Sequence, residues 1–157
     1  MSGPSPASGQ SYSVTGAQTF QTLLPGQGNA QCFTLTITNT LVPLTLQSVR
    51  FTNKTLGAPG TPQAQLDAEL GQPRLYLDRD GSATFQPGAD SPSLSQATAS
   101  GGILLFSGLS VAVPALGTVR LFVVTDIPTA VRDGDNLDLS IQAASDLTFN
   151  AGVATNA

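Results

Sequence analysis

The chain has 157 residues, of which 40% are hydrophobic and only 10% are charged, and its formal net charge is −4. This length is typical of a single domain, and the acidic balance argues against nucleic acid, which binds to basic surfaces. The sequence contains no histidine and a single cysteine, Cys32. Zinc sites of the usual kind, Ser-His-Asp catalysis and an intrachain disulfide therefore lack the residues that they require.

The charged residues include one lysine and one glutamate, which is too few for an ordinary cytoplasmic surface. We therefore expect an extracellular or cell-surface protein. No apolar segment follows Met1, so the expected form is a mature or engineered one without a signal peptide. No run approaches the ~20 apolar residues of a membrane helix, and no membrane insertion is expected.

The first 23 residues are interpreted as an N-terminal extension, and residues 24–157 as the β-domain. Residues 1–11 are rich in Ser, Gly and Pro and predict no regular structure. Residues 12–23 carry Val14 and Phe20 among polar residues and predict a first strand.

The next two predicted strands differ in their patterns. Residues 31–38 alternate strictly, with Phe33 on the apolar face and Cys32 on the opposite, threonine-rich face. Residues 44–52 change phase halfway, which predicts a β-bulge or a strand that passes from one sheet to the other.

Residues 56–73 predict a polar insertion, within which Gln63–Leu70 could form one or two helical turns. Residues 91–101 are polar and predict no strand. Further strands are predicted at 74–78, in two pieces within 102–113, at 118–127, at 137–143 and at 147–149. The total is about eight or nine strands with frequent turn signals, which favours an all-β sandwich. A jelly roll or barrel is the second choice.

Three segments carry a resemblance to a known class of domain: CFTLTITNTLVPLTLQSVRFTNKT, RLYLDRDGSATFQPGAD, and LLFSGLSVAVPALGTVRLFVVTDI followed by DGDNLDLSI. Together, over residues 30–150, they resemble the immunoglobulin-like repeat domains of large secreted bacterial surface proteins. In those domains a strand ending in T-N precedes a long loop, and a later hairpin leads into a D-G-D turn. The architecture is also similar, more weakly, to TasA-like filament subunits, which have a strand-like N-terminal extension. Neither resemblance implies catalysis.

An acidic loop is the best candidate for a specific site. Asp78, Asp80 and Asp90 flank a turn that contains Gly81, and calcium prefers several carboxylate and carbonyl oxygens. The segment resembles the D-x-D-G loops of secreted calcium-binding repeats but departs from the EF-hand, since it has no glutamate at position twelve. The predicted cofactor is therefore calcium or none. The structural alternative is a β-hairpin turn that uses Asp and Gly for its geometry.

A second acidic group contains Asp126, Asp133, Asp135 and Asp138. The Asp-Gly-Asp-Asn segment within it predicts a hairpin turn. A glycosidase would need two carboxylates that flank a sugar cleft, and the chain has no tryptophan to line one. We therefore predict no enzymatic activity.

Two further residues have competing interpretations. Cys32 is expected to be a small residue packed under a loop, and the alternative is an intermolecular disulfide. Asn53 begins the sequence Asn-Lys-Thr, which matches the acceptor motif for N-glycosylation.

The N-terminal strand gives the functional hypothesis. If residues 12–23 left their own domain and completed a neighbour's sheet, as in donor-strand complementation, copies of the chain would join into a filament. Tyr12, Val14, Phe20 and Leu23 would fill the neighbour's core. With one lysine in the chain, edge strands have little protection by charge. In the alternative hypothesis the strand stays in its own fold, and the chain is a monomeric binding or spacer module for other surface proteins or glycans.

Overall fold

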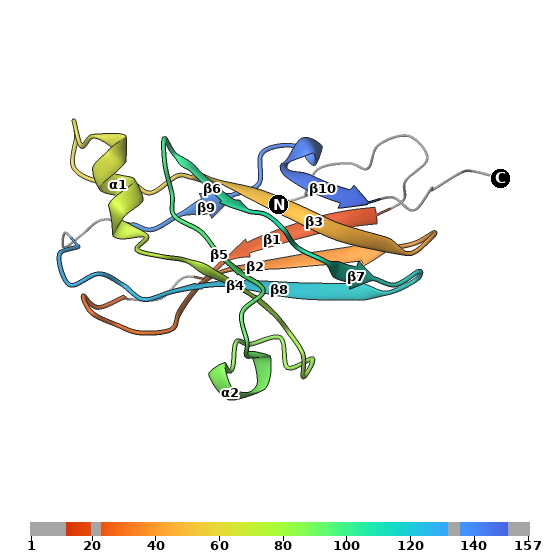
Figure 1. The fold of residues 1–157 in the computed structure, drawn as a ribbon. Coiled ribbons are helices and arrows are strands. Elements are labelled where there is room, and N and C mark those ends of the chain that lie inside the picture. Colours follow the sequence, from red (N-terminus) through yellow and green to blue (C-terminus); the bar gives the residue numbers. More distant parts are fainter. Residues whose placement is uncertain (1–11, 20–22, 132–135, 151–157) are drawn as a thin grey trace.

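The computed structural model describes residues 12–19, 23–131 and 136–150, which form two antiparallel sheets lying face to face (Figure 1). The predicted all-β sandwich is confirmed, and the described strands form two open sheets rather than a barrel. Among the described residues, no helix has the length and apolar character needed to cross a bilayer.

Sheet A contains five strands in the order β1-β2-β8-β4-β5. Residues of β2 and β8 pair along most of their length, from Ala30 opposite Thr125 to Thr38 opposite Thr118. The strand bounds are β1 (Tyr12–Gln18), β2 (Ala30–Asn39), β8 (Thr118–Thr125), β4 (Arg74–Leu77) and β5 (Ser95–Gln96).

Sheet B is built around one long strand, β3 (Leu44–Asn53). Shorter strands pair with β3 along its two edges, with β6 and β7 on one side and β9 and β10 on the other. Their bounds are β6 (Ile103–Phe106), β7 (Val111–Val113), β9 (Leu139–Ser140) and β10 (Leu147–Asn150). The predicted phase change in β3 is confirmed, because the pairing passes from β7 to β6 across an irregularity at Gln47 and Ser48.

The helical content is small. Helix α1 (Gln63–Glu69) confirms the helical turns predicted in the insertion, and the following Leu70 is fully buried. Helix α2 (Pro87–Asp90), the 3₁₀ turn η1 (Ala144–Asp146) and strand β5 were not predicted, because elements of two to four residues show no readable periodicity.

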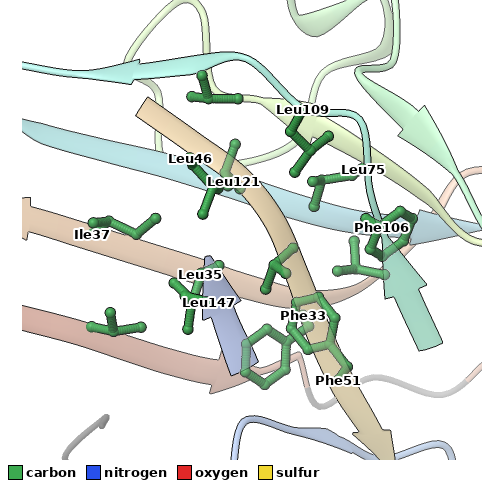
Figure 2. Close-up of a cluster of buried hydrophobic side chains, with 14 of the residues drawn as sticks. Phe33, Leu35, Ile37, Leu46, Phe51, Leu75, Phe106, Leu109, Leu121 and Leu147 are labelled. Carbon is green, nitrogen blue, oxygen red and sulfur yellow. The ribbon is translucent and has the colours of Figure 1, made fainter. Parts of the chain in front are cut away.

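The core lies between the two sheets, and aromatic rings from both sheets meet within it (Figure 2). The ring of Phe33 from β2 lies edge-on to Phe51 from β3, with centroids 5.2 Å apart, and Phe51 lies edge-on to Phe106 at 6.1 Å. Such edge-to-face contacts add about 0.5–1.5 kcal/mol per pair to the free energy gained by burial.

The expected burial of Cys32 is confirmed, but its expected place on the threonine-rich face of β2 was wrong, because the side chain belongs to the core between the sheets. The pairing of β2 with β8 shifts register between Gln31 and Phe33, and the shift leaves both Cys32 and Phe33 buried. Burial raises the pKa of the Cys32 thiol to about 12. A buried thiol with a raised pKa is a poor nucleophile, which argues against the intermolecular disulfide.

We expect the Cys32 thiol of the folded protein not to react with Ellman's reagent at pH 8. Unfolding in urea exposes the side chain and lowers its pKa to the ordinary range, so that one thiol per chain should then react. Rapid labelling of the folded protein would contradict the buried position.

Asp67 fastens helix α1 to sheet B. Its carboxylate accepts hydrogen bonds from the Asn53 amide at 2.8 Å, the Gln63 amide at 3.0 Å and the Gly102 backbone N–H at 3.0 Å. Burial alone would raise the pKa of Asp67, but these hydrogen bonds outweigh it and lower the pKa below its ordinary value. Asn53 and Thr55 are both buried, so the glycosylation motif is not accessible in the folded chain.

The substitution Asp67→Asn should lower the free energy of unfolding by about 1–3 kcal/mol at pH 7, because an amide nitrogen would face one of the donors. The native pKa of Asp67 is lowered, so its contribution is present above the unfolded pKa of about 3.9 and is lost as the pH falls below it. Urea unfolding from pH 7 to pH 3 measures both effects.

The stability difference between wild type and Asp67→Asn should therefore shrink on acidification. Asp138→Asn is the control, since this residue lies outside the cluster around Asp67. A constant difference across this pH range would contradict the assigned role.

Candidate functional site

The acidic loop is not a tight turn. Residues 78–94 leave β4 and run over the outer face of sheet A, with α2 on the side away from sheet B (Figure 1). Phe85 anchors the loop there, with its ring centroid 4.5 Å from that of Tyr76 and 6.2 Å from that of Phe122. The Phe85 backbone N–H also donates to the Gln31 side chain at 3.0 Å.

This path brings the three predicted aspartates together. One carboxylate oxygen from each of Asp78, Asp80 and Asp90 lies within 4.8 Å of the other two. Their environments differ, since Asp90 is fully buried and Asp80 is exposed.

Asp90 joins the start of the loop to its middle. Its Oδ1 accepts the Arg79 backbone N–H at 2.9 Å, and its Oδ2 accepts the Gln86 backbone N–H at 2.8 Å. The Arg79 guanidinium donates to the backbone carbonyls of Asp90 and Pro92. Arg79 therefore stabilises the loop through carbonyl oxygens rather than by pairing with a carboxylate.

Asp78 continues the pairing of β4 with β8, since its backbone N–H donates to the Arg120 carbonyl at 2.9 Å. Its Oδ2 accepts the Arg120 guanidinium at 2.7 Å and the Ala83 backbone N–H at 3.1 Å. Asp80 accepts the Ser82 backbone N–H at 3.0 Å. Hydrogen bonding from Ser82 lowers the pKa of Asp80 below its ordinary value.

Arg120, Arg79 and Phe85 were not predicted as parts of this site. Phe85 had a visible signal, because it is an aromatic residue within a polar loop. The pairing of Arg120 with Asp78 depends on the register of β4 against β8, which sequence patterns do not reveal.

The second acidic group is not assembled by the described residues. Asp126 accepts the Asn29 backbone N–H at 2.8 Å and pairs with Arg74 at 3.0 Å, while Asp138 immediately precedes β9. Asp133 and Asp135, with the turn predicted there, lie outside the described residues.

The N-terminal strand β1 lies in its own chain's sheet A, antiparallel to β2, with Tyr12 opposite Asn39 and Gln18 opposite Phe33. The proposed assembly residues Tyr12 and Val14 are buried in the chain's own core, and Leu23 is half-buried. Phe20 lies outside the described residues.

Side chains of β1 also reach sheet B. The Gln18 amide donates to the Leu137 carbonyl at 2.9 Å and accepts the Leu139 backbone N–H at 3.1 Å. The Tyr12 ring lies 4.6 Å from that of Phe149 in β10. Strand β1 therefore closes the edge of the sandwich between β2 and the strands β9 and β10.

The described surface has open hollows. One of about 490 Å³ adjoins the acidic loop and is lined by Asp78, Gly81, Pro114 and Arg120 among others. Another, of about 390 Å³, lies between α1 and the segment that follows β8.

We expect Phe85→Ala to lower the free energy of unfolding by about 3 kcal/mol, because the loop loses its anchor on Tyr76 and Phe122. Equilibrium urea unfolding measures this change. Leu116→Ala is the matched control, since Leu116 is 85% exposed, and it should change stability by no more than about 0.5 kcal/mol. Equal effects of the two substitutions would contradict the anchoring role.

The comparisons with known proteins give no family for this chain. No family model matches it, and no curated protein is significantly similar to it.

Proposed function

We propose that this chain is a non-catalytic structural module of an extracellular or cell-surface protein, with the strand arrangement of an immunoglobulin-like repeat. The observation that carries the proposal is the position of β1. Tyr12 and Val14 lie in the chain's own core, and Gln18 joins β1 to the other sheet, so β1 is an integral strand of the described sandwich.

The use of the aspartates supports a structural role. Asp67, Asp80, Asp90, Asp126 and Asp146 each accept at least one backbone N–H from a loop. Carboxylates used in this way fix the shape of loops, and a catalytic carboxylate would instead face a substrate cleft. Other surface proteins or glycans are the partners that such loops would bind.

Self-assembly through β1 is the second candidate. Strand β1 lies at the N-terminal end of the described fold, and its only strand partner among the described residues is β2. The groove that it fills would accept the same strand from another copy, with all side-chain contacts retained. A chain of such exchanges would propagate from head to tail into a filament.

A pair of cysteines can distinguish the two candidates. Thr15 and Thr36 lie directly opposite each other in β1 and β2, at a spacing of about 5.5 Å between Cα atoms that a disulfide can span. In the double variant Thr15→Cys and Thr36→Cys, we expect oxidation to give a monomer on a non-reducing gel. A ladder of linked chains would overturn the self-contained module and support exchange of β1.

Negative-stain electron microscopy tests independently whether the chain assembles into filaments. The full chain should form monodisperse particles if β1 stays in its own fold. Filaments that disappear on deletion of residues 1–22 would instead support the assembly function. The shortened chain should be less stable in either case, because Tyr12 and Val14 no longer fill the core.

A further inference from the structure

One buried oxygen in the acidic loop has no hydrogen-bond partner. The Asp78 side chain is only 2% exposed, and its Oδ2 is held by Arg120 and Ala83. Its Oδ1 is buried without a partner among the described residues. An unsatisfied oxygen of a buried carboxylate is costly, so a ligand at this position would stabilise the fold.

The charges around this oxygen favour a cation. The carboxylates of Asp78, Asp80 and Asp90 approach within 4.8 Å of one another, and like charges at this distance repel. Arg120 pairs with Asp78, whereas the guanidinium of Arg79 faces backbone carbonyls. Three negative charges are thus opposed by one directly paired positive charge.

We propose that Asp78, Asp80 and Asp90 together bind one calcium ion, with Oδ1 of Asp78 as a ligand. A cluster that offers only oxygen ligands suits a hard cation, and calcium accepts more irregular geometry than magnesium. Asp90 can still contribute, because each carboxylate oxygen has two lone pairs and its printed hydrogen bonds use one on each oxygen. This site is independent of the proposed structural function.

The expected affinity is low. Arg120 competes with the ion for Asp78, and calcium sites in extracellular modules have dissociation constants on the order of 10⁻⁴–10⁻³ M. Calcium would cross-link the two ends of the loop at Asp78 and Asp90, and so hold Phe85 more firmly on sheet A.

The first experiment measures the melting temperature of the full chain by calorimetry, in EGTA and in 10 mM calcium chloride at matched ionic strength. We expect calcium to raise Tm by roughly 3–6 °C. Magnesium chloride at the same concentration should give a smaller rise. The absence of a calcium-dependent rise, or an equal rise with magnesium, would overturn the calcium site.

A matched pair of variants locates the effect. Asp80→Asn and Asp138→Asn each remove one negative charge, but only Asp80 belongs to the cluster. Asp80 is exposed, so its replacement should leave the chain folded. The calcium-dependent rise should disappear in Asp80→Asn and persist in Asp138→Asn. A rise of equal size in both variants would show general charge screening and overturn the assignment.

The variant Arg120→Gln tests the role of Asp78 directly. It removes the cation that competes for Asp78 while keeping a hydrogen-bond donor on β8. Calorimetric titration with calcium chloride should show binding at least about fivefold tighter than in wild type. Unchanged or weaker binding in a variant that still folds would overturn the ligand role of Asp78.

Discussion

The second half of strand β8, from Leu121 onward, is buried on both faces, and the shape of the acidic loop follows from this constraint. Leu121 and Val123 enter the core between the sheets, while Phe122 and Val124 lie on the outer face of sheet A and are equally buried. Apolar side chains on an outer face need a cover, and Phe85 provides it. Because Phe85 lies in the middle of the connection from β4 to β5, that connection must fold back over the sheet. The return brings Asp90 beside Asp78, so the acidic cluster is a consequence of covering β8.

Carboxylates also hold the other loops in place. The chain has few charged residues, and those described lie largely inside its hydrogen-bond network. Asp67 ties the helical insertion to the end of β3, and Asp146 accepts the backbone N–H groups of Gln142 and Ala143 before β10 begins. Hydrogen bonds to ionised carboxylates are stronger than neutral ones. A small number of them can therefore define long connections that would otherwise have few constraints.

The strands of the sandwich could be predicted, because alternation with a period of two reports which residues face the core. This held for β2 and β3, and the phase change inside β3 was also readable, whereas β8 was predicted from its run of apolar residues. The bulge that buries Cys32 could not be predicted, since a register shift of one residue depends on the partner strand.

The aspartates of the candidate site, Asp78, Asp80 and Asp90, could be grouped because they are close in sequence. Arg120, which lies opposite Asp78 through strand register, could not. Asn53 was interpreted as a glycosylation site from a motif that carries no information about burial. In the structure its side-chain amide donates a hydrogen bond to Asp67.

The contact between Tyr12 and Phe149 has a mechanical consequence. Tyr12 begins β1 and Phe149 lies near the end of β10, and their rings are 4.6 Å apart. The polypeptide therefore enters and leaves the sandwich at the same corner (Figure 1). Tension applied through both ends would act on this corner and peel the edge strands β1 and β10 away one hydrogen bond at a time, without stretching the body of the sandwich. In a longer polypeptide, a pulling force would therefore pass through this corner and would not be transmitted through the body of the sandwich.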